Sequence, residues 1–119
     1  MIIAIIGSRS LFVDNIEKYL PENITEIVSG SAKGIDTCVK LYAMKNKIKL
    51  TEFLPDYSRY RKGAPLKRNL EIIDYAEEVI AFWDGKSKET EFVIKECKKK
   101  NKIITVYLYD EQRMNYIKV

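Results

Sequence analysis

Short apolar runs alternate along this chain with segments of helical periodicity. The apolar runs are rich in β-branched residues, and the segments between them repeat apolar positions every three or four residues. This alternation is typical of a parallel sheet whose two faces are covered by helices. The predicted strands are 2–6, 24–28, 48–54, 79–83 and 103–108, and the predicted helices are 12–20, 35–46, 65–76 and 89–100.

The apolar content of each strand predicts its place in the sheet. The runs 2–6 and 79–83 are the most continuously apolar and are expected in the middle, whereas 48–54 alternates as an edge strand does. Right-handed crossovers then restrict the topology to a doubly wound, Rossmann-like sheet. We predict one α/β domain over residues 1–119, a three-layer sandwich with a five-stranded parallel sheet in the order 3-2-1-4-5.

Small polar residues follow the first, second and fourth predicted strands. The chain reads GSRS at 7–10, SGSAKGID at 29–36 and DGKSKET at 84–90. In doubly wound sheets a ligand binds outside the carboxyl ends of the strands, where the strand order reverses. Glycine lets the backbone approach a phosphate, hydroxyls donate hydrogen bonds and helix N-termini attract anions. One such loop fits an ordinary turn equally well, but three converging loops favour a site for a phosphorylated ligand.

The predicted helix 65–76 carries two cations close to its start. Pro65 suits the first turn, and a stripe of Leu66, Leu70 and Ile73 is expected to be buried. The two cations that follow the proline oppose the helix dipole, which is unfavourable unless a partner offsets them.

Arg68 is the more informative of these two cations, since its neighbour Lys67 fits a solvated position. Two interpretations are open: Arg68 pairs with an acid such as Asp56 or Asp84, or it is held ready for a ligand phosphate with Asn69 beside it. The guanidinium fork suits bidentate phosphate recognition better than an ammonium does.

Other side chains also have a structural and a functional interpretation. Asp36 either caps a helix or binds ligand hydroxyls. Tyr57, Tyr60 and Trp83 could stack on a base, although Trp83 also fits the end of the core. Asp84 is placed like a catalytic or ribose-binding carboxylate, or forms a turn with the glycine that follows it.

Composition narrows the classes of chemistry. The 119 residues are 46% apolar and 32% charged, as expected for a folded soluble domain. The 21 Lys and Arg against 17 Asp and Glu give a net charge of +4, which suits an anionic partner, although four lysines within 98–102 complement a helix end. The absence of histidine excludes an imidazole base, a Ser-His-Asp triad and a His-ligated metal.

The cysteines and the N-terminal run suggest the cellular setting. Cys38 and Cys97 fall in helical patterns and are expected to pack in the core instead of forming a disulfide or a metal site. The apolar run at 1–6 stops at Gly7, so we expect no signal peptide, no membrane partner and a cytoplasmic location.

The loop motifs together resemble the SLOG superfamily. GSRS at 7–10, IVSGSAKGID at 27–36, PLKRN at 65–69 and VIAFWDGKSKET at 79–90 are most similar to the small YspA-like, YpsA-related bacterial branch, and more distantly to DprA and LOG phosphoribohydrolase proteins. The resemblance spans 2 to about 106. It implies a Rossmann-like fold that binds a nucleotide or nucleotide-derived ligand. The implied contacts are Gly7, Ser8, Arg9, Ser29, Gly30, Lys33, Gly34, Asp36, Arg68, Asn69, Asp84, Gly85, Ser87 and Thr90.

The chain departs from the family pattern at three positions. Ser31 stands where the family often has glycine, and Glu89 stands before Thr90 where a Gly-Thr pair is usual. Glu89 could repel a phosphate, or point outward and merely favour the helix dipole. Val93 occupies the position of the catalytic glutamate of the LOG enzymes.

These observations rank three functions. The first is binding or sensing of a nucleotide-like ligand. The second is hydrolysis of an N-glycosidic or phosphate bond, with Asp84 or Glu89 as the carboxylate base. The third is single-stranded DNA binding of the DprA type, which the mild charge and the absence of a continuous basic stripe disfavour. Self-association is compatible with so small a domain.

Overall fold

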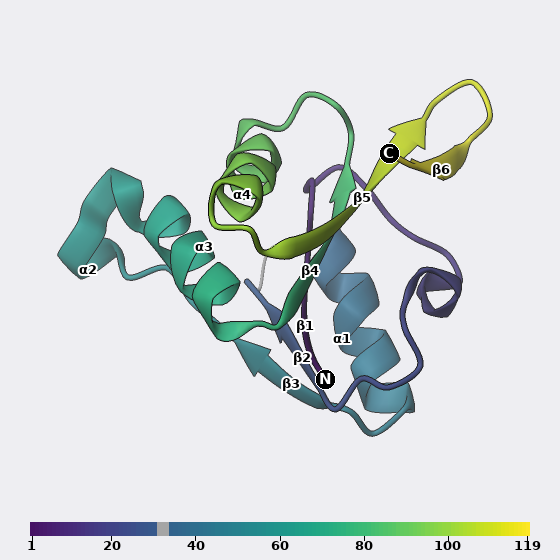
Figure 1. Ribbon diagram of the computed structural model, residues 1–119, viewed down its shortest axis with the longest axis horizontal. Helices are drawn as coiled ribbons and strands as arrows, with labels where there is room; N and C mark the ends of the chain where they lie inside the picture. The colour runs from purple at the N-terminus through teal and green to yellow at the C-terminus, as the bar shows by residue number, and fades with distance from the viewer. Residues whose placement is uncertain (31–33) are drawn as a thin grey trace.

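The apolar runs of the sequence form the centre of one mixed sheet. The computed structural model describes residues 1–30 and 34–119. The strands are β1 (Ile2–Gly7), β2 (Glu26–Ser29), β3 (Lys49–Glu52), β4 (Glu78–Trp83), β5 (Ile103–Asp110) and β6 (Asn115–Lys118). Among the described residues the sheet order is β3-β2-β1-β4-β5-β6 (Figure 1). The strands from β3 to β5 pair in parallel, which confirms the predicted order 3-2-1-4-5.

The sixth strand was not predicted. β6 pairs antiparallel with β5, with Leu108 opposite Ile117. Asp110 starts the connecting turn, because its carboxylate accepts hydrogen bonds from the amides of Gln112 and Arg113. The pattern of β6 is short and mostly polar, so only its position after this turn indicates a strand.

The helices agree with the predicted segments except at the start of the chain. They are η1 (Ile16–Tyr19), α1 (Ile35–Lys45), α2 (Tyr57–Tyr60), η2 (Arg61–Gly63), α3 (Ala64–Tyr75) and α4 (Lys88–Lys99). The predicted helices 35–46, 65–76 and 89–100 are each confirmed to within one residue at both ends.

The predicted helix 12–20 is wrong, because this segment forms only the short 3-10 turn η1. Leu11 and Val13 are buried two residues apart, as in extended chain, and Asn15 then adopts a left-handed conformation with φ 53°. Leu20 is extended because Pro21 disfavours the helical conformation for the residue before it, so the 3-10 turn ends at Tyr19. The segment therefore lies over the sheet as a loop.

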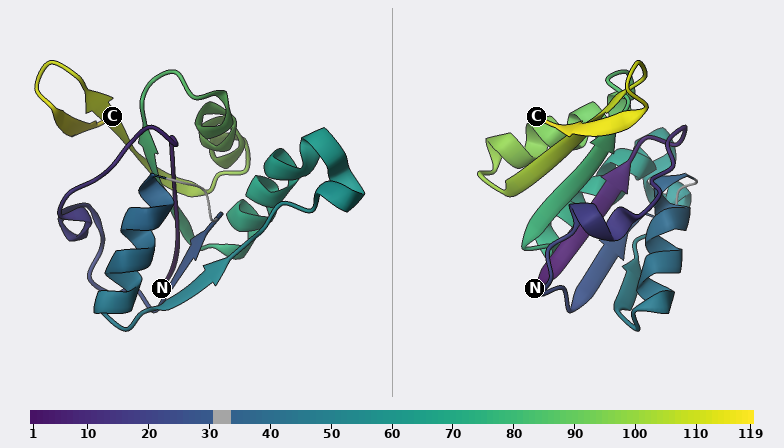
Figure 2. Two further views of the ribbon diagram at one scale, coloured as in Figure 1. Left: turned by 180° about the vertical axis from the view of Figure 1, so that it is seen from behind. Right: turned by 90° about the vertical axis from the view of Figure 1, so that its right-hand side faces the viewer.

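Helices cover both faces of the sheet (Figures 1 and 2). The side chains of β1 alternate between the two: Ile3 and Ile5 join the core that includes α1 and η1, whereas Ala4 and Ile6 join the core that includes α3 and α4. Burial on both faces explains why this strand is apolar throughout. The three-layer α/β sandwich is therefore as predicted.

The buried face of α3 differs from the predicted stripe. Ile73 is buried as expected, but Leu66 is 40% exposed. Arg68 and Asn69 are buried in place of Leu66. The first half of α3 borders a polar cleft instead of the apolar core, so polar side chains fill its inner face there.

Both cysteines are free thiols that pack among apolar side chains, as predicted. Cys97 is fully buried, and burial raises the pKa of its thiol to about 11. Cys38 is partly buried, and its sulfur accepts a hydrogen bond from the Val13 amide at 3.4 Å. No helix in the described part of the chain is long and apolar enough to cross a membrane.

Candidate functional site

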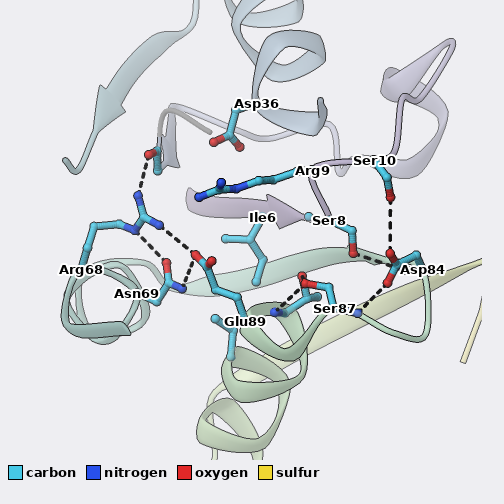
Figure 3. Close-up of a pocket in the computed structure, with 14 residues that line it drawn as sticks. Ile6, Ser8, Arg9, Ser10, Asp36, Arg68, Asn69, Asp84, Ser87 and Glu89 are labelled. Atoms are coloured by element: carbon cyan, nitrogen blue, oxygen red, sulfur yellow. Dashed lines mark hydrogen bonds and ion pairs between the residues drawn. The ribbon is translucent and has the colours of Figure 1, made fainter. Parts of the chain in front are cut away.

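A cleft of about 290 Å³ opens at the carboxyl ends of β1, β2 and β4 (Figure 3). This is the edge where the sequence places its three polar loops, and where doubly wound sheets bind ligands. The residues that line it are Ile6, Gly7, Ser8, Arg9, Ser10, Gly30, Asp36, Arg68, Asn69, Asp84, Ser87, Glu89, Thr90 and Val93.

Most of the predicted ligand contacts meet in this cleft. Ser29, Gly34 and Gly85 do not line it, and Lys33 lies outside the described residues, as does Ser31. The residues brought together are Gly7, Ser8, Arg9, Gly30, Asp36, Arg68, Asn69, Asp84, Ser87 and Thr90.

Three lining residues were not predicted as contacts. Ile6 directly precedes the predicted loop GSRS at 7–10 and Ser10 is its last residue, so the position of that loop already indicated both. Val93 lies on α4 one turn after Glu89, on the same side of the helix. Its apolar side chain occupies the cleft at the position where the resemblance places a catalytic glutamate.

Arg68 forms the most tightly bonded corner of the cleft. Its side chain is 5% exposed, and its Nη1 donates to the Gly30 carbonyl at 2.6 Å. Nε donates to Asn69 Oδ1 at 2.9 Å, and Nη2 donates to Glu89 Oε1 at 2.9 Å. Asn69 Nδ2 donates to the same Glu89 oxygen at 3.1 Å. Three protein partners thus fix the guanidinium in one plane (Figure 3).

The ion-pair partner of Arg68 is therefore Glu89 and neither of the predicted acids, Asp56 and Asp84. Asp56 instead caps α2 by accepting the Arg59 amide. Of the two alternatives for Glu89, the outward-pointing one is wrong, because its carboxylate reaches from α4 to Arg68 on α3. The pairing depends on how these two helices pack, which sequence spacing does not reveal.

Gly30 is required where the Arg68 guanidinium lies against the backbone. A Cβ at Gly30 would stand 2.8 Å from Nη1 and 2.9 Å from Cζ of Arg68. No side chain fits there unless the guanidinium moves. Gly30 therefore leaves space for the guanidinium of Arg68. The sequence alone does not distinguish this role from that of a glycine in an ordinary turn.

Asp84 joins the loops that follow β1 and β4. Its Oδ1 accepts the amides of Lys86 and Ser87, both at 2.8 Å, and its Oδ2 accepts the Ser10 hydroxyl at 3.3 Å. Its own amide donates to Ser8 Oγ at 3.2 Å. Burial alone would raise the pKa of the Asp84 carboxyl, but these hydrogen bonds outweigh it and hold the pKa below its usual value. Asp84 is therefore an ionised acceptor that organises the turn.

The start of α4 contributes hydroxyl and backbone groups to the cleft. Ser87 is the N-cap, and its Oγ accepts the Thr90 amide at 3.4 Å and the Thr90 hydroxyl at 3.2 Å. The Trp83 indole donates to the Ser87 carbonyl at 3.1 Å while its ring packs against the core under α3 and α4. Trp83 thus completes the core, and it does not line the cleft.

Arg9 and Asp36 lie on the side of the cleft near α1. Asp36 is buried in the first turn of α1, whose N-cap position belongs to Gly34, so the capping interpretation of Asp36 is corrected. In Figure 3 the Arg9 side chain extends toward the side where Asp36 and Arg68 lie. Within the part of the chain that the structure describes, Arg9 makes no ion pair, which leaves its charge available to a ligand.

The aromatic residues of α2 do not reach the cleft. Tyr60 lies under Arg59 and Lys67, whose cationic groups are 5.2 Å and 5.7 Å from the ring centre, and Tyr57 is 57% exposed. Base stacking by these two tyrosines at the cleft therefore has no support in the structure. Among the described residues no group of His, Cys, Asp or Glu could hold a metal ion.

Comparison of the chain with protein-family models, with curated proteins and with solved structures found no match. The fold and cleft define an α/β sandwich with a polar site at the carboxyl edge of its sheet. The resemblance to the SLOG superfamily stays a prediction.

Proposed function

We propose that this chain binds or senses a nucleotide or nucleotide-derived ligand as a SLOG-like domain. The observation that carries the proposal is the meeting of Arg9, the hydroxyl-rich loops after β1 and β4, and the start of α4 in one cleft. A phosphate would lie near Arg9 and the start of α4, where the Arg9 cation and the amides of the helix start favour an anion. Asp36 would accept hydrogen bonds from ligand hydroxyls.

The size of the cleft supports a small ligand. A volume of about 290 Å³ is at the lower end of the range for small-molecule sites. It suits a mononucleotide better than a dinucleotide. The free thiols of Cys38 and Cys97 fit a reducing compartment, so we place the protein in the cytoplasm as part of this proposal.

Binding ranks before hydrolysis because both candidate bases are already engaged. Asp84 accepts hydrogen bonds on both carboxylate oxygens, and its lowered pKa makes it a weak proton acceptor. Glu89 is paired with Arg68 and hydrogen-bonded to Asn69. The carboxylates of Asp84 and Glu89 are therefore both occupied by protein hydrogen bonds, whereas a general base needs a carboxylate oxygen free to face the reacting proton.

Thermal unfolding in the presence of nucleotides, nucleotide sugars and ADP-ribose tests this function. At a free concentration of 100 times its Kd, a specific ligand should raise the Tm by about 10 °C. Arg9→Gln should abolish most of that rise, because it removes the cation that faces the ligand. The matched control is Arg59→Gln, which removes the same charge from α2, outside the cleft.

Two outcomes would contradict the proposal. If no compound in the panel raises the Tm, nucleotide binding is wrong. If a compound raises it equally in the wild type and in Arg9→Gln, the ligand binds elsewhere. Release of free base or ribose phosphate from a bound nucleotide would instead show that the protein is a hydrolase.

A further inference from the structure

The Arg68 corner of the cleft already holds an anion, the carboxylate of Glu89. Its Oε1 accepts from Arg68 Nη2 at 2.9 Å and from Asn69 Nδ2 at 3.1 Å. A phosphate or carboxylate oxygen of a ligand would use the same two donors. All three side chains line the cleft, so an incoming ligand can reach this corner.

The corner keeps its shape without Glu89. Arg68 is also held by the Gly30 carbonyl at 2.6 Å and by Asn69 Oδ1 at 2.9 Å, and neither contact involves the carboxylate. The Arg68 side chain is 5% exposed, so surrounding groups restrict its movement as well. Because Arg68 and Asn69 are positioned in advance, a second anion would find both donors in place.

Glu89, in contrast, is placed to leave. Its side chain is 37% exposed, and it lies in the first turn of α4, at the rim of the cleft. A rotation about its side-chain bonds would move the carboxylate into solvent while the helix stays unchanged. The remaining cost is the loss of one ion pair and one hydrogen bond, which a replacing anion would restore.

We propose that Glu89 is a specificity-determining residue that competes with the anionic groups of ligands for Arg68 and Asn69. While the carboxylate is in place, a ligand anion can be held near Arg9 but not in the Arg68 corner. The cleft thereby selects against ligands whose second anionic group would have to lie in the Arg68 corner while the first is bound near Arg9. This inference rests on the proposed function for the identity of the ligand, but its central contact can be tested with a simple anion.

The test compares wild type with Glu89→Gln and Glu91→Gln by thermal unfolding in increasing inorganic phosphate, with chloride matched for ionic strength. Glu89→Gln removes the competing charge and keeps the shape of the side chain. Glu91→Gln removes the same charge from the same turn of α4, where Glu91 pairs only with Lys95 among the described residues. AMP and ADP are titrated in parallel on all three proteins.

Glu89→Gln should lower the Tm without phosphate, because Arg68 loses its counter-charge, and added phosphate should restore it. The apparent Kd for phosphate should be at least about tenfold lower in Glu89→Gln than in wild type. The ratio of the ADP to the AMP Kd should fall by a similar factor. Glu91→Gln should behave as wild type in both measurements.

The inference is overturned if phosphate stabilises Glu89→Gln no more than Glu91→Gln, since Glu89 then serves only to neutralise Arg68. If Glu89→Gln does not fold, Glu89→Ala and Glu89→Ser replace it, and failure of all three to fold also overturns the claim that Glu89 is dispensable to the corner. If Glu89→Gln alone binds phosphate and no variant binds a nucleotide, this inference stands and the proposed function is refuted.

Discussion

The close contact between Gly30 and Arg68 predicts that adding one methyl group at Gly30 lowers the free energy of unfolding. In Gly30→Ala the new Cβ would stand 2.8 Å from Nη1 of Arg68, well inside van der Waals contact. The φ of Gly30 is not positive, so an alanine there does not have to adopt the left-handed conformation, and the overlap with Arg68 is the destabilising effect of the substitution. Gly30 directly follows β2, whose last residue Ser29 is paired with Glu52 in the sheet, so the guanidinium is the group that we expect to move.

Movement of Arg68 would weaken its hydrogen bonds to the Gly30 carbonyl and to Glu89. Hydrogen bonds of charged groups contribute about 1.5–3 kcal/mol each, and the partial exposure of Glu89 reduces its share. A Gly→Ala change also stabilises by about 0.4–1 kcal/mol through the unfolded chain. We expect a net loss of about 2–3 kcal/mol in the free energy of unfolding.

Equilibrium unfolding in urea measures this difference, and Gly63→Ala is the matched control. A Cβ at Gly63 meets no atom within 4 Å, so this variant should be as stable as wild type or slightly more stable. In an Arg68→Ala background the overlap is absent, and Gly30→Ala should then cost almost nothing. Equal stability of Gly30→Ala and Gly63→Ala, or additive effects of the Gly30 and Arg68 changes, would refute the reasoning.

Two further predictions concern Asp84 and the cysteines. Hydrogen bonds lower the pKa of Asp84 in the folded protein, so its contribution to stability is present above the unfolded pKa and is lost as the pH falls through the folded pKa. Asp84→Asn should therefore flatten the acid side of a plot of unfolding free energy against pH, below about pH 4. An unchanged acid side would contradict this. Burial raises the pKa of the Cys97 thiol to about 11, so Cys97 should resist iodoacetamide near neutral pH until the protein unfolds. Cys38 is only partly buried and should react first. Equal labelling rates of the two thiols in the native protein would show that burial does not protect Cys97.

Periodicity predicted the sheet well because burial on two faces leaves a direct mark on a strand. The apolar positions of β1 belong to two cores, and the alternation of apolar and polar residues in β3 reflects its place at an edge. Loop composition predicted the location of the cleft for a similar reason, since every loop after a parallel strand opens at the same edge. These features are local in sequence.

The contacts inside the cleft could not be predicted in the same way. Arg68 and Glu89 are 21 positions apart on two different helices, and only the packing of α3 against α4 brings them together. The spacing of Leu66 predicts a place in the core, but the inner face of α3 borders the cleft at that end and Leu66 is exposed. Side-chain partners across elements are a property of the assembled fold.

The hydrogen bonds of Asp84 also bear on the order in which the protein folds. They link Ser8 and Ser10 to a residue 76 and 74 positions away, across the full separation between β1 and β4. Such distant pairs form only after the intervening chain has closed a long loop, which is slow and entropically costly. The hydrogen bonds of Asp84 should therefore be among the last contacts of the cleft to form, and a chain truncated before β4 cannot form them.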